Sequence, residues 1–243
     1  MAGEYVRWLA RDVKPAEKKE LTPREKRRNW WAYHKWHVII AAVCLILAAD
    51  LVSDAVRNVR NKPDYTIAYV GYTELPEGIA RALETAIAGQ GEDLNGNGQV
   101  QAELVQYRIY DESTDDDPAL WEQAYSASVQ LTSSIEMVES MIYLLEDPAI
   151  FNTNYPILCH ADGTLPGAGS DAPLYYLWKD CPVLTGLELG AIELPAEEGI
   201  VVIDCQQAMA GIAVARRGLW NDEANERTDG AVRLFEALTA GAK

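Results

Sequence analysis

The stretch 65-YTIAYVGYTELPEGIARALETAIAG-89 holds the pattern on which the predicted fold depends. Its first seven residues, Tyr65–Gly71, are mostly β-branched, aromatic or small, which is typical of a buried strand. A turn containing Pro76 follows, and apolar side chains then recur every four positions at Ile79, Leu83 and Ile87. That spacing places them on one face of a helix. A buried strand followed at once by an amphipathic helix indicates an α/β fold.

The same order of elements continues along the chain. Val100–Tyr110 and Met141–Leu145 have strand-like composition, and a helix is predicted between them, beginning at Asp115–Pro118. Strands separated by helices at this spacing favour parallel pairing. We therefore expect a mostly parallel sheet flanked by helices. The buried stripe of the second helix is predicted at Leu120, Ala124, Ala127, Leu131 and Ile135.

The C-terminal part is less regular. Gly199–Asp204 (GIVVID) is predicted as a fourth strand of the parallel sheet, and Tyr155–His160 and Ala210–Arg216 are further strand candidates. Residues 162–173 are rich in Gly, Pro and Asp and predict a loop. A closing helix is expected over residues 222–240, with Val232, Phe235 and Leu238 facing inward.

Residues 64–150 resemble the first lobe of extracellular solute-binding proteins. The resemblance rests on the order of the elements, on a helix ending in 130-QLTSSIEMVES-140 and on the strand and turn 141-MIYLLEDPAIF-151. It implies a third strand that ends in an acidic turn beside a ligand cleft, and a second lobe that is reduced. Ligands of open α/β sheets bind at the carboxyl ends of the strands, so we expect a ligand-binding site lined by Tyr72, Glu74, Tyr110 and Glu146.

The stretch before this domain has the features of a single membrane span. Val38–Ala49 has no polar side chain, and Trp36–Val56 supplies 21 residues, where about 20 are needed to cross the hydrocarbon core. Ten Lys and Arg precede Val38, which favours a cytoplasmic N-terminus. A signal peptide cleaved near Ser53-Asp54-Ala55 and the buried helix of a soluble protein are the alternatives.

Four parts follow from this interpretation: a basic cytoplasmic tail (1–35), a transmembrane helix (36–56), a short stalk (57–63) and an extracytoplasmic α/β domain (64–243). The segment 29-NWWAYHKWH-37 resembles the lead-in of many uncharacterised single-span membrane proteins of Firmicutes. That resemblance implies an anchor in the cell membrane and carries no activity.

Charge divides the chain in the same way. Residues 1–62 have a net charge of +6, and residues 63–243 have a net charge of −22. A basic tail suits the anionic inner leaflet of a membrane, whereas the acidic part lacks the clustered cations that nucleic-acid binding requires. The expected partners are therefore the lipid bilayer and a small solute or a neighbouring membrane protein, and not nucleic acid.

The motif 93-DLNGNGQ-99 predicts a calcium site or a tight turn. Oxygen-bearing side chains at alternate positions, followed by Gly98, are typical of a loop that wraps a calcium ion. Asp93, Asn95 and Asn97 would supply the first ligands, the carbonyl of Gln99 the next, and Glu103 a late carboxylate. The twelfth position is Leu104 instead of the usual Glu. Asn-Gly sequences also form plain tight turns, and both interpretations stay open.

The sequence contains no arrangement that indicates an enzyme. Common nucleophile, phosphate-loop and zinc-protease motifs are missing. Cys159 and His160 are adjacent, and neighbouring side chains on a strand point to opposite faces. Cys159, Cys181 and Cys205 fit either one disulfide with a free thiol or three unpaired cysteines. We expect a membrane-tethered extracellular binding module; the alternatives are a surface hydrolase that uses paired carboxylates and a structural or assembly component of the envelope.

Overall fold

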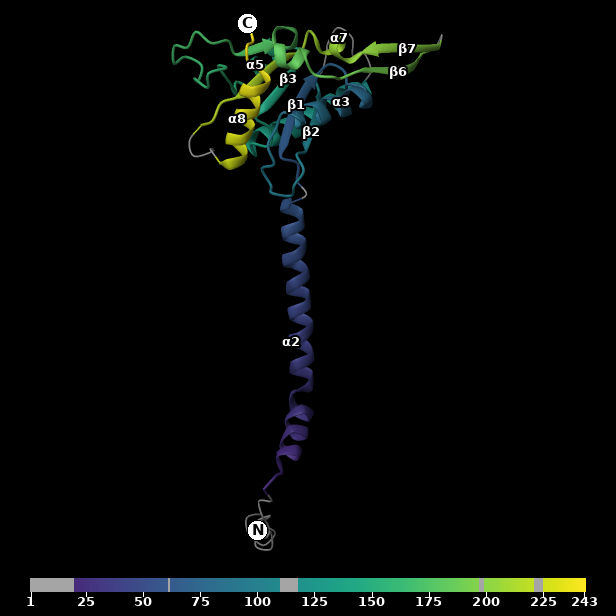
Figure 1. Ribbon diagram of the computed structural model, residues 1–243, viewed down its shortest axis with the longest axis vertical. Coiled ribbons are helices and arrows are strands. Elements are labelled where there is room, and N and C mark those ends of the chain that lie inside the picture. The colour runs from purple at the N-terminus through teal and green to yellow at the C-terminus, as the bar shows by residue number, and fades with distance from the viewer. Residues whose placement is uncertain (1–19, 61, 110–117, 197–198, 221–224) are drawn as a thin grey trace, which may run out of the picture. The chain divides into compact units, whose positions relative to one another are not determined.

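The computed structural model describes residues 20–60, 62–109, 118–196, 199–220 and 225–243 (Figure 1). The chain divides into two units, Met1–Arg57 and Asn58–Lys243. The first unit contains most of helix α2 (Pro23–Arg60). Within the described residues, α2 is the one helix long and apolar enough to cross a membrane, over Pro23–Asp54, and none of its apolar window is buried. Exposed side chains such as Leu45 and Leu51 argue against a helix in a soluble core.

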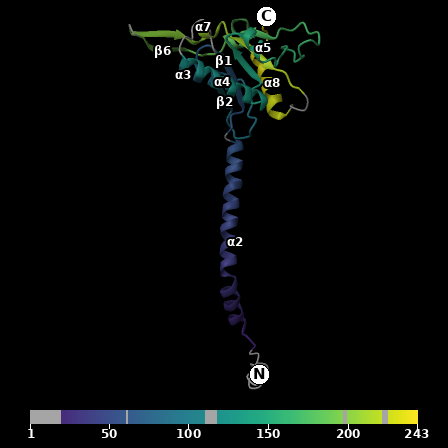
Figure 2. The ribbon, with the colours of Figure 1, turned by 180° about the vertical axis from the view of Figure 1, so that it is seen from behind.

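The second unit is built on a six-stranded sheet (Figure 2). Its strands are β1 (Tyr65–Gly71), β2 (Ala102–Arg108), β3 (Ile142–Leu145), β4 (Leu158–Cys159), β5 (Tyr175–Leu177) and β8 (Ala213–Arg217). The order is β2-β1-β3-β8-β4, and β5 also pairs with β8. Strand β1 is parallel to β2 and β3, whereas β8 is antiparallel to β3, β4 and β5. All strands except β8 therefore run in one direction, which confirms the mostly parallel sheet.

Helices cover both faces of this sheet. One face packs α3 (Glu77–Ala88) and α8 (Glu226–Leu238) against alternate residues of β1, β3 and β8. The other face packs α4 (Pro118–Glu136) and α5 (Pro148–Asn154) against the intervening residues. Burial of Ile79, Leu83 and Ile87 confirms the predicted face of α3. Shorter segments complete the unit: η1 (Trp178–Asp180), α6 (Pro182–Thr185) and α7 (Cys205–Met209).

The prediction that Gly199–Asp204 belongs to the main sheet is wrong. This segment is β7, and among the described strands it pairs only with β6 (Ala191–Ala196), in a separate antiparallel ribbon. The two strands are close in sequence, so their pairing closes only a short loop, with Gly199 at a φ of 124°. The interior position next to β3 goes to β8, whose residues Ala213–Arg217 are all buried. Its small residues Ala213 and Ala215 let helices approach the sheet closely.

The outer edge of the sheet is partly covered. Strand β2 pairs with β1 on one side only. On its other side the carboxylate of Glu84, from α3, accepts a hydrogen bond from the backbone N–H of Leu104 at 2.9 Å. An unpaired backbone donor on an edge strand is a template for pairing with another chain, and Glu84 occupies this one.

Candidate functional site

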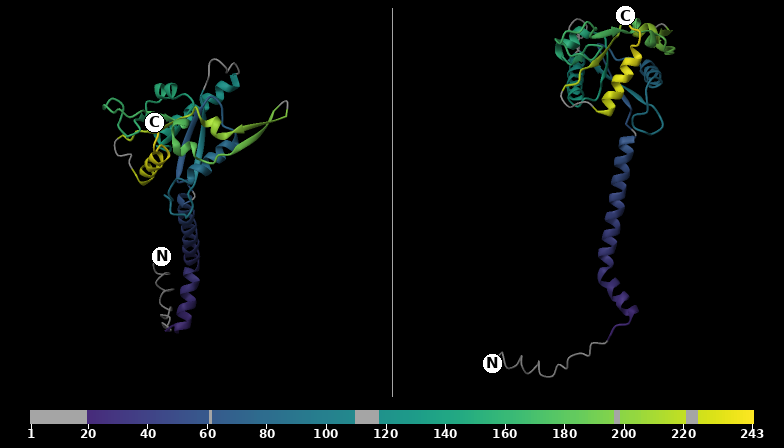
Figure 3. Two further views of the ribbon diagram at one scale, coloured as in Figure 1. Left: turned by 45° about the horizontal axis from the view of Figure 1, so that its top comes forward. Right: turned by 60° about the vertical axis from the view of Figure 1, so that its left-hand side comes forward.

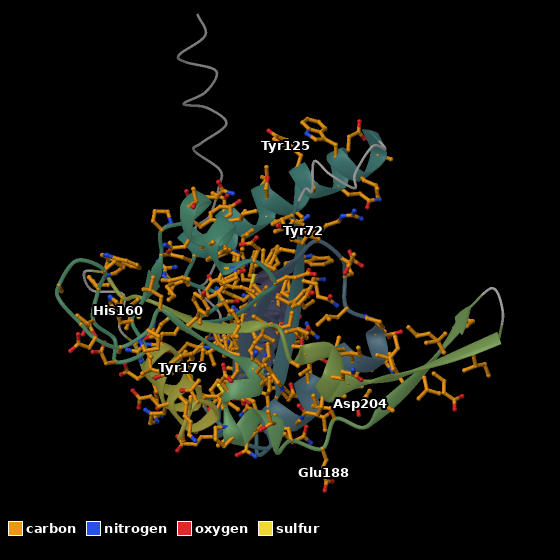
Figure 4. All side chains as sticks on the ribbon, turned by 90° about the horizontal axis from the view of Figure 1, so that it is seen from above. Tyr72, Tyr125, His160, Tyr176, Glu188 and Asp204 are labelled. Atoms are coloured by element: carbon orange, nitrogen blue, oxygen red, sulfur yellow. The ribbon has the colours of Figure 1, made fainter. Side chains whose placement is uncertain are left out.

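Two residues predicted at the carboxyl ends of the parallel strands do meet. The Glu146 carboxylate accepts a hydrogen bond from the backbone N–H of Tyr72 at 2.8 Å. The Tyr72 hydroxyl donates to the carboxylate of Asp147 at 3.2 Å. Figure 4, seen from above, shows Tyr72 on the same side of the domain as Tyr125 of α4. Glu74 is exposed in the same turn, and Tyr110 lies outside the described residues.

Close packing beneath this turn explains why Gly71 ends β1. A side chain at Gly71 would place its Cβ 2.6 Å from both the Glu146 carboxylate and the Tyr69 hydroxyl, a distance at which something must shift. Burial, and secondly the Glu146 carboxylate, raise the pKa of Tyr69. The phenol therefore stays protonated and faces the carboxylate at 3.5 Å.

Two polar residues at this end were not singled out from the sequence. Asp147 caps α5, because its carboxylate accepts hydrogen bonds from the N–H groups of Ala149 and Ile150. The side chain of Gln106, on β2, accepts from the N–H of Leu75 at 2.7 Å. The order Asp147-Pro148 is an N-cap signal that could have identified the first. These contacts hold the turns in place and engage much of the polar surface that a ligand would use.

The predicted calcium residues lie in and after the loop between α3 and β2. Asp93 accepts hydrogen bonds from the N–H groups of Gly96, Asn97 and Gly98 at 2.7, 3.2 and 2.7 Å. These donors, that of Gly98 above all, lower the pKa of Asp93. Gly96 and Gly98 have φ values of 68° and 86°, which favour glycine.

The other candidate ligands face backbone groups as well. The side-chain oxygen of Asn95 accepts from the N–H of Asn97 at 2.9 Å, and that of Asn97 accepts from the N–H of Gln99 at 2.7 Å. Glu103 is exposed on β2. In the described parts of the chain, no three His, Cys, Asp or Glu side chains are grouped so as to hold a metal ion. Calcium binding stays a prediction.

A buried carboxylate that the sequence did not reveal organises this loop. Asp64 is only 3% exposed. Its two oxygens accept from the N–H groups of Leu94, Asn95 and Gln101 at 2.9, 3.0 and 2.8 Å. A carboxylate that gathers several backbone donors makes charge-assisted bonds, which are stronger than neutral ones. Asp64 therefore fixes the start of β1 to the middle of the loop and to its last residue, Gln101.

A groove of about 630 Å³ opens at the opposite end of the sheet, where β1 begins. Its apolar wall includes Val105, Met137 and Met141, and Glu103 and Glu139 are exposed at it. Neither carboxylate has a hydrogen bond or ion pair within the described residues, although both raise the pKa of nearby Tyr107 after the larger effect of burial. Lys62 and Arg227 line the groove as well, and Arg227 donates to the carbonyl of Pro63 at 2.7 Å. The groove therefore combines apolar surface with charged groups of both signs.

A strained residue lies at this groove. Val138 has a φ of 54° and is the one non-glycine residue with positive φ in the described ranges. It lies in the turn that follows α4, where its N–H bonds to the carbonyl of Ile135 and the N–H of Glu139 bonds to that of Ser134. Glycine usually fills such a position, and an L residue there costs on the order of 1–2 kcal/mol. Strain of this kind is often found at binding sites.

The cysteine and histidine candidates are held in structural roles. All three domain cysteines are buried and unpaired, which corresponds to the second of the two predicted states. Burial raises the pKa of Cys181 to about 11, so that thiol is a poor nucleophile. His160 contacts the carbonyl of Ala172 through Nδ1 at 2.5 Å. This contact ties the loop over 162–173 to β4 and involves no cysteine.

No protein-family model matches this chain. Neither a curated protein nor a solved structure matches it. The geometry of the described residues is thus the basis for assigning a function.

Proposed function

We propose that the protein is a membrane-tethered, extracytoplasmic binding module whose α/β domain is related in fold to a lobe of a solute-binding protein. Its tether would be α2, with a cytoplasmic N-terminus, because the basic residues precede the apolar run. The observation that carries the proposal is the groove at the start of β1, which joins an apolar wall to the carboxylates of Glu103 and Glu139. Of the two cations that also line the groove, Arg227 is bonded to the carbonyl of Pro63 and Lys62 is exposed. Because the two carboxylates are engaged by no described residue, the surface suits a ligand with one cationic and one apolar part.

The composition of the wall supports binding rather than catalysis. Met137 is 61% exposed, and Val138 and Met141 also line the groove. Unbranched methionine side chains adapt to irregular apolar ligands. Glu103 and Glu139 are exposed, whereas a glycosidase usually keeps its acid in an apolar pocket. This difference ranks the hydrolase with paired carboxylates below the binding module.

The proposal is tested on the full chain in nanodiscs of neutral phospholipid. Hexylamine, which is cationic and apolar, is expected to raise the melting temperature, and hexanoate of the same length is not. The double variant Glu103→Gln, Glu139→Gln should lose the hexylamine effect. A control with the same change of charge, Glu122→Gln, Glu136→Gln on α4, should retain it. An equal response in both double variants would assign the effect to net charge and would overturn the groove site.

A further inference from the structure

The β6–β7 ribbon contributes no residue to the groove at the start of β1. Figure 3 shows it projecting away from the sheet and helices. Three consecutive aliphatic side chains of β7 are exposed: Ile200 by 68%, Val201 by 50% and Val202 by 65%. An isolated two-stranded ribbon is at best marginally stable in water. Exposed contiguous aliphatic residues of this kind usually mark an interaction site.

The register of the ribbon shows that both of its faces are apolar near the tip. Val201 lies opposite Leu194, and on the other face Ile200 lies opposite Pro195. Only the base is covered, because Ile192 and Ile203 pack against the main core. Among the described residues, packing against the main core therefore stabilises only the base of the ribbon.

The ribbon also has two open edges. Each of its strands pairs with the other on one side and with no further strand among the described residues. Its backbone donors and acceptors on the outer sides are available for strand addition, in which an extended segment of a partner joins a sheet edge. Strand β2, at the edge of the main sheet, differs because Glu84 occupies one of its outward donors.

Charge identifies the kind of segment that would fit. Between Lys179 and Arg216 the sequence has no basic residue and six acidic ones, which are Asp180, Glu188, Glu193, Glu197, Glu198 and Asp204. On one face of the ribbon, Glu193 lies opposite Val202 and Asp204 opposite Ala191, and Figure 4 places Asp204 where the ribbon joins the domain. A second copy would bring like charges together, which disfavours association.

We propose that the β6–β7 ribbon is a docking arm that receives an extended segment of a partner protein, in which apolar residues alternate with Lys or Arg. The segment adds as a third strand. Its apolar side chains lie on the face of Leu194 and Val201, and its cations lie on the opposite face, beside Glu193 and Asp204. This interaction is separate from the groove at the start of β1 and does not depend on its ligand.

The test uses the full chain in neutral nanodiscs and three labelled nonapeptides. One alternates Lys with Val, one has the same composition with its lysines in a single block, and one alternates Glu with Val. Fluorescence anisotropy should give the alternating Lys/Val peptide a dissociation constant at least tenfold below that of the block peptide. The Glu/Val peptide should not bind. Amide hydrogen exchange over residues 199–204 should slow when the Lys/Val peptide is bound.

Matched variants separate the ribbon from general attraction. Val202→Lys should weaken binding of the alternating peptide at least tenfold. Val129→Lys, at a position 53% exposed on α4, makes the same chemical change on another surface and should leave binding unchanged. Equal loss in both variants, equal binding of the block peptide, or unaltered exchange over residues 199–204 would each overturn the proposal. So would dimerisation of the chain without peptide that Val202→Lys abolishes, since a second copy would then be the occupant.

Discussion

Comparison of Asp64 with Asp93 measures how much burial increases the stabilisation that a carboxylate provides when it accepts backbone hydrogen bonds. Each carboxylate accepts three backbone N–H hydrogen bonds, and at least two of the three donors in each case lie in the loop between α3 and β2. Asp64 is 3% exposed, whereas Asp93 is exposed. We expect Asp64→Asn to destabilise the domain far more than Asp93→Asn does.

The expected magnitude follows from the bonds that Asp64 makes. An amide group offers one acceptor oxygen, so after the substitution an NH₂ group faces at least one of the three backbone donors. A hydrogen bond to a charged group contributes about 1.5–3 kcal/mol, and an unsatisfied buried donor costs about 1–3 kcal/mol. Because water reaches part of this loop, we expect a loss of about 3 kcal/mol, or roughly 6–12 °C in melting temperature for a domain of this size.

Thermal unfolding followed by circular dichroism near 290 nm, in the same nanodiscs for each variant, would measure the difference. This near-ultraviolet signal reports the packed aromatic side chains of the domain. Asp93→Asn should lower the melting temperature by less than half as much as Asp64→Asn, because its donors can exchange the carboxylate for water. Equal shifts in the two variants, or no shift for Asp64→Asn, would refute the reasoning that burial decides the value of these bonds.

Four further predictions concern the core, the calcium loop, pH and topology. Leu83→Ala, at a fully buried position, should cost about 2–5 kcal/mol in urea unfolding; a cost below 1 kcal/mol would contradict the packing of α3. If the Asp93 loop binds calcium, millimolar calcium should raise the melting temperature above that in EDTA, and Asp93→Ala should remove the difference. An identical melting temperature with and without calcium would mean that the loop is a tight turn that binds no calcium. Hydrogen bonds from Ser170 and Thr164 lower the pKa of Asp162 to about 2, so these bonds should persist above pH 4 and be lost as the pH falls toward 2; an NMR titration midpoint near 4 would exclude them. Protease added to intact cells should digest residues 63–243 and spare residues 1–29, and a protected C-terminal part would reverse the orientation.

The sequence predicted the local elements better than it predicted how they pair. Composition identified β1, and periodicity identified α3, because each depends on its own residues. For α8, the inward residues Phe235 and Leu238 were predicted correctly, whereas Val232 is only partly buried and the buried Leu234 was missed. The place of Gly199–Asp204 depends on competition between strands, and a short connection to Ala191–Ala196 wins over the main sheet. The composition of Gly199–Asp204 suits a strand of the main sheet and a strand of the ribbon equally well, so composition alone does not predict which partner it pairs with.

Prediction of the site was limited in the same way. Tyr72 and Glu146 were placed at one edge of the sheet because the carboxyl ends of parallel strands meet there. The groove was not predicted, since it combines the start of β1 with the turn after α4 and the start of α8. The buried acceptor Asp64 was also missed, because its three donors are about 30 or more residues away in sequence. Contacts of this range leave no periodic signal.

The carboxylate of Glu84 on the outer side of β2 affects whether neighbouring copies of the protein can join through the edges of their sheets. In the tethered arrangement proposed above, neighbouring copies share one plane and collide far more often than dissolved molecules would. An uncovered edge of the main sheet would then recruit other copies, and the result would be aggregation into continuous sheets. By occupying the Leu104 donor at 2.9 Å, Glu84 makes that edge a poor template and adds negative charge to it. On this arrangement, densely packed copies would remain individual molecules, and the ribbon would stay available for the partner segment proposed above.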